Sequence, residues 1–205
     1  MSEVLQVTQV AVGGFDHNFS YIILAADGEC ALVDPTGDTG LLRQKLAEAG
    51  EIKPRYILLT HSHHDHTAGI PAVKKFFPAD VYAHPLAGYP GQRSLAAGEW
   101  LPLGTSGIEV MYTPGHSPDS VCYLLPSGGG IFTGDTLFIG CCGYCEPEQM
   151  FASLQKLKTL SPAHIIYSGH DYGDVAYETL GEQMRRNPCL TPADMRQFKK
   201  ALRDI

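Results

Sequence analysis

The segment Thr60–Gly69 reads Thr-His-Ser-His-His-Asp-His-Thr-Ala-Gly, so four of its ten residues are histidine and one is aspartate. It directly follows the apolar run Tyr56–Leu59, which comes after Pro54 and predicts a short buried strand. Ligands and catalytic groups of layered α/β folds gather at strand ends, and we expect the histidines to lie at such an end. Because imidazole is the commonest metal ligand in proteins, the segment predicts a metal site rather than a solvated polar loop.

Three later fragments repeat one order of residues: an apolar run, small residues, and then a side chain that can bind a metal. They are Thr113-Pro114-Gly115-His116, Thr133-Gly134-Asp135 and Ser168-Gly169-His170. The glycine before each candidate ligand gives the backbone freedom to turn that side chain toward a common centre. Together with the first segment, they supply five histidines and two aspartates from four separate loops. The remaining histidine of the first segment, His64, we interpret as a solvated loop residue.

The composition is that of an ordinary globular protein. The 205 residues are 44% hydrophobic and 18% charged, and the formal net charge is −7. A negative net charge argues against nucleic acid as the main partner, because phosphate binding favours a basic surface. The N-terminal residues lack the pattern of a signal peptide, and no apolar run has the length of a membrane span. We expect a soluble, cytoplasmic protein with a small-molecule substrate, no membrane partner and an undetermined oligomeric state.

Short apolar runs between turn residues predict a series of strands, at residues 4–10, 21–25, 31–33, 56–59, 81–83, 109–113, 121–125, 131–133 and 165–168. Apolar spacing and capping residues predict helices, at residues 41–50, 72–77, 148–160 and 175–186, with a last helix opening at Thr191. Residues 85–107 are rich in Gly, Pro and Ala, without clear periodicity, and are expected to be irregular.

Three of the six cysteines stand close together in the sequence, at Cys141, Cys142 and Cys145. Cys142 and Cys145 have the Cys-x-x-Cys spacing of redox pairs, but the helix predicted near Glu148 begins after both of them. No second Cys/His pair stands at zinc-finger spacing. We therefore interpret these cysteines as ordinary loop thiols.

The pattern His61-x-His63-x-Asp65-His66, followed by His116, Asp135 and His170, resembles the metallo-β-lactamase fold superfamily. The resemblance runs from about Asn18 to Asp171 and implies an α/β fold, an αββα sandwich with a two-metal site at one rim. It assigns to the first metal His61, His63 and His116. It assigns to the second metal Asp65, His66 and His170, with Asp135 as the bridge.

Two cations held in this way, about 3.5–4 Å apart, share a hydroxide that is available at neutral pH, and they polarise a carbonyl oxygen. The resemblance thus implies a hydrolase with a metal-bridging hydroxide, in which Asp65 and Asp135 are the carboxylates assigned to catalysis. A shell of imidazoles and carboxylates suits zinc foremost, with iron or manganese as alternatives.

Three fragments look most like the glyoxalase II group, which hydrolyses thioesters such as S-lactoylglutathione. They are Thr113–Ser117, Phe132–Phe138 and Gly169–Tyr172. Secreted zinc β-lactamases of the subclass closest to this pattern place a cysteine where Asp135 stands. Acyl-homoserine lactonases place a tyrosine where this chain has Phe138. Both comparisons favour a thioester hydrolase.

Two alternatives stay open beside this interpretation. Persulfide dioxygenases resemble glyoxalase II and use one Fe(II), for which the triad would be His61, His116 and Asp135. The second alternative is a thioesterase for coenzyme A or a carrier protein. Glyoxalase II enzymes have a basic residue after a Cys-Gly pair, and we predict substrate contacts at the equivalent residues, Cys142, Gly143 and Tyr144. Because Tyr144 carries no charge, we expect glutathione thioesters to be poor substrates.

The resemblance also predicts the organisation of the chain. We expect residues 1–173 to form the metallo-β-lactamase-like catalytic domain. Residues 174–205 are expected to form C-terminal helices packed on the same domain, without the full helical domain of glyoxalase II.

Overall fold

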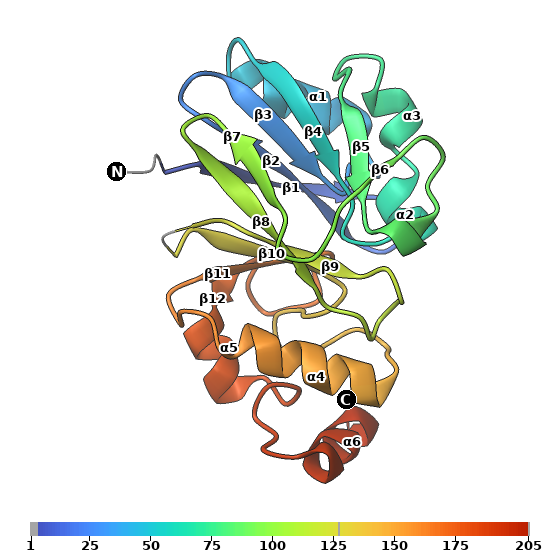
Figure 1. The fold of residues 1–205 in the computed structure, drawn as a ribbon, viewed down its shortest axis with the longest axis vertical. Coiled ribbons are helices and arrows are strands. Elements are labelled where there is room, and N and C mark those ends of the chain that lie inside the picture. The colour runs from blue at the N-terminus through green and yellow to red at the C-terminus, as the bar shows by residue number, and fades with distance from the viewer. Residues whose placement is uncertain (1–3, 127, 205) are drawn as a thin grey trace.

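The structure, a computed structural model, describes residues 4–126 and 128–204 of the chain. Two six-stranded sheets lie face to face, and helices cover the outer face of each sheet (Figure 1). Four layers therefore succeed one another along the long axis, from α1 and α3 to α4 and α6. This arrangement confirms the αββα sandwich expected from the sequence.

The first sheet has its strands in sequence order, namely β1 (Gln6–Gly13), β2 (Asn18–Leu24), β3 (Glu29–Val33), β4 (Lys53–Leu58), β5 (Asp80–Ala83) and β6 (Arg93–Ser94). Strands β1 to β3 pair antiparallel, whereas β3 to β6 pair parallel. Nearly every residue of β2 and β3 is buried, because helices cover one face of the sheet and the second sheet covers the other.

The second sheet has the spatial order β12-β11-β10-β9-β8-β7. Its strands are β7 (Trp100–Leu103), β8 (Ser106–Tyr112), β9 (Val121–Leu124), β10 (Gly130–Gly134), β11 (Ile165–Ser168) and β12 (Glu178–Thr179). Only β10 and β11 pair parallel among these strands. Each sheet thus contributes parallel strands whose carboxyl ends meet at one rim, which is where binding groups gather in α/β folds.

The helices of the described residues are α1 (Thr39–Glu48), α2 (His64–Thr67), α3 (Ile70–Val73), α4 (Pro147–Leu157), α5 (Leu180–Arg186) and α6 (Met195–Asp204), with one 3-10 turn, η1 (Pro85–Ala87). Asp38 caps the N-terminus of helix α1, where its carboxylate accepts hydrogen bonds from two backbone N–H groups of the first turn. None of these helices is long and apolar enough to cross a membrane.

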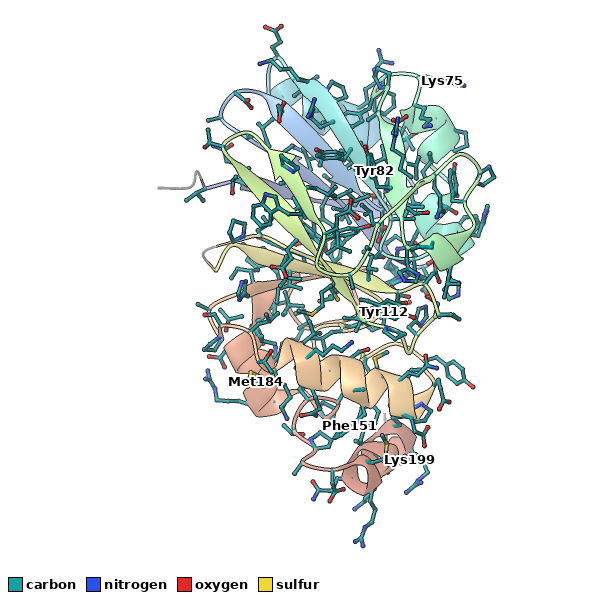
Figure 2. The ribbon with its side chains drawn as sticks, in the orientation of Figure 1. Lys75, Tyr82, Tyr112, Phe151, Met184 and Lys199 are labelled. Atoms are coloured by element: carbon teal, nitrogen blue, oxygen red, sulfur yellow. The ribbon has the colours of Figure 1, made fainter. Side chains whose placement is uncertain are left out.

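Three apolar layers hold the sandwich together. The central layer lies between the sheets and is rich in aromatic side chains, such as Tyr21 and Phe132, whose rings are 5.1 Å apart. Tyr82 borders this layer from β5, and Tyr112 borders it from β8 (Figure 2). The two outer layers fix the helices on the sheets. Each fully buried apolar side chain contributes about 1.5–3 kcal/mol, so the layers dominate the stability of the fold.

The helix predicted at residues 175–186 is shorter than expected, because α5 begins only at Leu180. Glu178 and Thr179 form β12 and pair antiparallel with β11, and the Thr179 hydroxyl caps α5 by accepting from the Glu182 N–H. Pairing with the sheet therefore prevails over local helix propensity in this segment. The last helix also begins later than predicted. The carboxylate at its start is that of Asp194, which accepts from the Gln197 N–H.

Residues 85–107, expected to be irregular, contain two strands. β7 pairs with β8 in a regular antiparallel ladder although it contains Pro102, which cannot donate a backbone hydrogen bond. The proline is tolerated because β7 is the edge strand of its sheet. The short strand β6 likewise forms the edge of the first sheet.

The C-terminal helix α6 packs on α4. Phe198 of α6 is fully buried, and its ring lies 5.4 Å from that of Phe151 on α4. Lys199 forms an ion pair with Glu148 at the start of α4. Figure 2 shows Phe151 and Lys199 in the region where the two helices meet.

Candidate metal centre

The seven predicted donors lie at one rim of the sandwich, where strands of both sheets end. The loop and short helix after β4 carry His61, His63, Asp65 and His66. The loops after β8, β10 and β11 carry His116, Asp135 and His170, respectively. The structure therefore brings together residues that are up to 109 positions apart, between 61 and 170.

Backbone hydrogen bonds join the two sheets at this rim. The Val121 N–H donates to the Thr60 carbonyl at 2.8 Å, and the Phe19 N–H donates to the Gly169 carbonyl at 2.9 Å. Gly134 precedes Asp135 with a φ of +48°, and a Cβ atom at this position would lie 2.4 Å from Thr60 Oγ1. Only glycine allows the two loops to approach so closely.

The first cluster of donors consists of His61, His63 and His116, whose ring nitrogens all lie within 4.8 Å of one another. His63 Nδ1 is 3.0 Å from His61 Nε2 and 2.9 Å from His116 Nε2. His61 is buried, whereas His63 is exposed. This cluster opens to solvent on one side.

The second cluster consists of Asp65, His66 and His170. The Nε2 atoms of the two histidines are 3.3 Å apart. Asp65 Oδ2 lies 3.4 Å from His66 Nε2 and 3.3 Å from His170 Nε2. Both histidines are buried, so this cluster is more enclosed than the first.

Asp135 lies between the two clusters. Its Oδ1 is 3.3 Å from His66 Nε2, and its Oδ2 is 3.3 Å from His170 Nε2 and 3.5 Å from His116 Nε2. The carboxylate therefore reaches donors of both clusters. Its Oδ1 atom is buried and accepts no hydrogen bond from residues 4–126 or 128–204. A buried acceptor without a hydrogen bond is costly unless a cation compensates it.

Backbone carbonyls fix the orientation of two histidines. His116 Nδ1 lies 2.9 Å from the Tyr144 carbonyl, and His170 Nδ1 lies 2.6 Å from the Asp16 carbonyl. Since a carbonyl oxygen only accepts, each Nδ1 carries the proton and donates it outward. The Nε2 lone pair of each ring is then directed into the centre, as in a metal-ligating histidine.

Asp34 orients the other two buried histidines, His66 directly and His61 through the Thr60 hydroxyl. Its Oδ2 lies 3.0 Å from His66 Nδ1 and accepts the hydroxyl of Thr60 at 2.5 Å. The Thr60 hydroxyl is thus committed to Asp34, and its oxygen accepts from His61 Nδ1 at 3.1 Å. The Nε2 atoms of His61 and His66 are therefore also free to bind a cation.

The charges of the second cluster balance one another within the protein. Burial lowers the pKa of His170, but hydrogen bonds to Asp135 and Asp65 outweigh it and raise the pKa to about 10. Burial likewise opposes a raised pKa at His66, where Asp34 and Asp135 prevail. The pKa of Asp135 is held well below its usual value by His170 and His66, although burial acts in the opposite direction.

The first cluster has the opposite tendency. Burial lowers the pKa of His61 well below its usual value, and the neighbouring His66 adds to this effect. Burial also lowers the pKa of His116. These rings are neutral at pH 7, which is the protonation state that binds a metal. The donors of both clusters, five imidazoles and two carboxylates with converging lone pairs, thus fit a pair of divalent cations.

The predicted substrate-contacting residues lie beside the first cluster. Tyr144 is 94% exposed, and its carbonyl holds His116. Gly143 packs so tightly that a Cβ atom would lie 2.4 Å from the Asp135 carbonyl oxygen. Cys142 is buried. His64 is exposed, and its ring lies 5.2 Å from that of Phe15.

A family model described as the metallo-beta-lactamase superfamily matches residues 13–170. The chain belongs to the metallo-beta-lactamase superfamily. The match begins at the end of β1 and ends at His170, so it includes all seven predicted donors.

Curated relatives within the superfamily include many hydroxyacylglutathione hydrolases. The hydroxyacylglutathione hydrolase of Anaeromyxobacter dehalogenans is 40% identical over 76% of this chain, which spans 62% of that relative's length. A protein of Bacillus velezensis named "Probable polyketide biosynthesis zinc-dependent hydrolase BaeB" is 32% identical over 83% of this chain and 80% of its own length.

Solved structures with the same fold include two whose sequences are 25% and 30% identical to this chain. ETHE1 from Myxococcus xanthus has a TM-score of 0.84 at 25% identity, covering 98% of this chain and 90% of its own. TTHA1623, solved in a di-iron-bound form, has a TM-score of 0.75 at 30% identity, covering 88% of this chain and 98% of its own.

Two residues that orient donors of this superfamily site were not predicted from the sequence, Asp34 and Asn18. Asn18 Nδ2 donates to Asp65 Oδ2 at 3.1 Å and so orients that carboxylate. Asp34 follows the buried strand β3 directly, which is the pattern used to find the other carboxylates. That pattern was a signal for Asp34, whereas a lone Asn18 at the start of a strand carries no comparable signal.

Proposed function

We propose that this chain is a metal-dependent thioester hydrolase of the glyoxalase II type that works with two divalent cations. The observation that carries the proposal is the position of Asp135, which reaches donors of both clusters at 3.3–3.5 Å. A one-metal site has no need of a second complete cluster. The hydroxyacylglutathione hydrolases among the relatives and the di-iron form of TTHA1623 support the same reading.

In this proposal each cluster holds one cation, and Asp135 belongs to both. The first cation would be held by His61, His63 and His116. The second would be held by Asp65, His66 and His170. When bound, two such cations would supply a hydroxide nucleophile at neutral pH and would polarise the thioester carbonyl. The name of the Bacillus velezensis relative supports zinc as the metal.

The residues of the chain supply orientation and charge for this chemistry. The Tyr144 and Asp16 carbonyls and the Asp34 carboxylate hold the imidazoles with their lone pairs inward. Asn18 donates to Asp65 and so orients this carboxylate, whose side chain is 26% exposed. Because these groups are fixed before substrate arrives, little reorganisation accompanies the reaction.

The surface beside His116 bears on which thiol carries the acyl group of the substrate. A hollow of about 320 Å³ lies there, and its lining residues are Gly115, His116, Ser117, Pro118, Tyr144, Cys145, Glu146 and Gln149. This lining has no lysine or arginine, and Glu146 is acidic. Glutathione carries two carboxylates, and charge-assisted contacts to them are worth about 1.5–3 kcal/mol each. We infer a pantetheine-type carrier, on coenzyme A or a carrier protein, as the preferred thiol.

The test compares kcat/KM for S-lactoylglutathione with that for acyl-CoA and acyl-pantetheine esters carrying the same acyl group. We expect the pantetheine-type esters to be preferred by about tenfold or more, as the missing charge contacts imply. A preference for the glutathione ester would refute the carrier assignment but leave the hydrolase assignment intact.

Elemental analysis of protein purified without chelators, together with oxygen consumption on glutathione persulfide, tests the reaction class. We expect two cations per chain and no oxygen uptake. One iron per chain with persulfide-dependent oxygen uptake would instead identify a persulfide dioxygenase, an alternative for which His61, His116 and Asp135 would form the iron triad.

A further inference from the structure

The last helix, α6, concentrates positive charge on one side. Its ten residues hold four of the fifteen lysine and arginine residues of the chain, whereas its only carboxylate is that of Asp204. The four have the spacing i, i+3, i+4 and i+7, which places side chains on the same face of a helix. They are Arg196, Lys199, Lys200 and Arg203, and we call them the basic face of α6.

The basic face is largely free of partners. Arg196, Lys200 and Arg203 are exposed and have no ion-pair partner among residues 4–126 and 128–204, whereas Lys199 is paired with Glu148. Because the net charge of the chain is −7, these basic residues reduce its charge and do not serve to keep it soluble. The basic face is therefore a surface that can attract a negatively charged partner.

Helix α6 also borders a hollow that leads to the candidate metal centre. Leu202 of α6 and the segment Cys141–Pro147 line this hollow, which has a volume of about 600 Å³. It shares part of its lining with the smaller hollow beside His116, namely Tyr144, Cys145 and Glu146. The two hollows are therefore adjacent and together extend from α6 to His116.

We propose that the basic face of α6 docks an acidic carrier protein, whose pantetheine arm passes along the two hollows and brings its thioester to the candidate metal centre. The inference rests on the hydrolase function proposed above and names the carrier of the acyl group. The positive charges lie outside the hollows, and neither lining contains a lysine or arginine. An uncharged pantetheine arm on an acidic protein matches this division, because complementary charges orient a partner and speed its association.

The extent of the basic face favours a protein surface over the phosphate groups of coenzyme A. The row covers seven positions along the helix from Arg196 to Arg203, which is about 10 Å at the rise of an α-helix. Charges spread over this length match a row of carboxylates on a partner helix better than they match one phosphate group. The partner is therefore a carrier protein with an acidic face.

The packing of α6 argues against a membrane surface as the acidic partner. A basic amphipathic helix binds a membrane by burying its apolar face among the lipids. The apolar side chains of α6 already pack in the protein core, where Phe198 is fully buried and Met195 and Leu202 are partly buried against the same cluster. Only its charged face is available to a partner, which suits docking of a folded protein.

The experiment uses one acyl group on two carriers, an acidic acyl carrier protein and free pantetheine, and measures the ratio of their kcat/KM values. The test variant carries Arg196→Glu and Lys200→Glu. Its matched control carries Lys74→Glu and Lys75→Glu, which change the net charge equally at two exposed residues directly after α3. Figure 2 shows Lys75 and Lys199 at opposite ends of the molecule.

We expect the ratio to fall about tenfold in the test variant and to stay at the wild-type value in the control. The ratio cancels any effect that the substitutions have on the metal centre itself. Raising the ionic strength from about 0.1 to 1 M should lower the wild-type ratio as well, because the screening length shortens from about 10 to 3 Å.

Equal ratios in the two double variants would overturn the docking surface. An equal fall of kcat/KM for acyl-CoA relative to acyl-pantetheine would assign the basic face to phosphate groups instead. Binding to vesicles that contain phosphatidylserine, with no fall in the ratio, would assign it to a membrane.

Calorimetric titration with the carrier protein bearing a non-hydrolysable acyl amide separates docking from hydrolysis. Tight binding that the test variant loses, in an enzyme that hydrolyses none of the esters, would support docking and refute the hydrolase. Hydrolysis of acyl-pantetheine by a wild type that binds the amide carrier no better than the test variant would refute docking alone.

Discussion

The two halves of the candidate metal centre are built differently. The first cluster contains the exposed His63 and depends on a backbone carbonyl, that of Tyr144, which stands in a surface loop. In the second cluster both histidines are buried, and the donors are held by the side chains of Asp34 and Asn18 together with the Asp16 carbonyl. The open half offers room for a substrate, whereas the closed half is held rigidly by charge. We therefore propose that the first half contacts the substrate and that the second half contributes more to cation retention.

Substitution of the residue shared by both halves should have the largest effect. We expect Asp135→Ala to lose both cations and to fall below about one hundredth of wild-type activity, since even outer partners of metal ligands cost 10–100-fold. His170→Ala, which affects only the second half, should retain one cation and measurable activity. Metal content and kcat/KM of the two variants provide the check. Equal residual activity at matched metal content would contradict the assignment of Asp135 to both halves.

Substitution of Asp34 should weaken the second half more than the first, because Asp34 contacts His66 directly and reaches His61 only through Thr60. Removing one partner of a buried ion pair costs about 3–5 kcal/mol, so Asp34→Ala should lower the free energy of unfolding by that order. Its loss also leaves the His66 Nδ1–H and the Thr60 N–H without their acceptors.

The matched variant is Asp34→Asn, which keeps an acceptor oxygen and tolerates the positive φ of 46° at this position. We expect it to recover about half of the stability, on the same scale for a buried pair. Thermal unfolding with metal counts measures both effects. Stronger cation loss from the first half than from the second would contradict the proposed division.

The two halves should also differ in their response to pH. His170 has its pKa raised from the usual 6.5 to about 10, so it must lose a proton to bind a cation at pH 7. Affinity in the second half should therefore increase with pH over this window, by about tenfold per unit for each proton displaced. In the first half, His61 and His116 have lowered pKa values, and affinity there should change little above pH 6.5. Competition titrations at pH 6.5, 7.5 and 8.5 would distinguish the two.

The raised pKa of His170 also makes the stability of the protein without bound cations depend on pH. Because the folded pKa of His170 is raised, its contribution to stability is fully present below about pH 6.5 and is lost as the pH increases toward 10. Unfolding of the chelator-treated protein should thus become easier over this range. Saturating zinc should remove that pH dependence, because the ligated ring no longer binds a proton.

The smallest expected effect concerns the open half. Tyr144→Arg would place a cation beside the first cluster, where glutathione carboxylates would lie, and should raise kcat/KM for S-lactoylglutathione by about tenfold. Tyr144→Phe is the control, because it removes the hydroxyl without adding charge, and it should leave this value near wild type. The absence of a gain with arginine would place the thiol half of the substrate elsewhere on the rim.

Local patterns in the sequence were enough for the fold class and for most strands. The strand predicted at residues 165–168 matches β11, because an apolar run bounded by turn residues requires only neighbouring positions to recognise it. The helix predicted at 175–186 was partly wrong because β12 forms by pairing with a strand elsewhere in the chain. Strand β7 was missed because Pro102 and its edge position hide the usual alternation.

The sequence by itself determined the kinds of donor, their loops and the family, since each of these rests on residues close together along the chain. Only the tertiary structure decided how the donors are held. The outward partner of His66 is 32 positions away, at Asp34, and that of His170 is 154 positions away, at Asp16. Hydrogen bonds act over a few ångströms of space whatever the separation in sequence, so no local pattern could have predicted these partners.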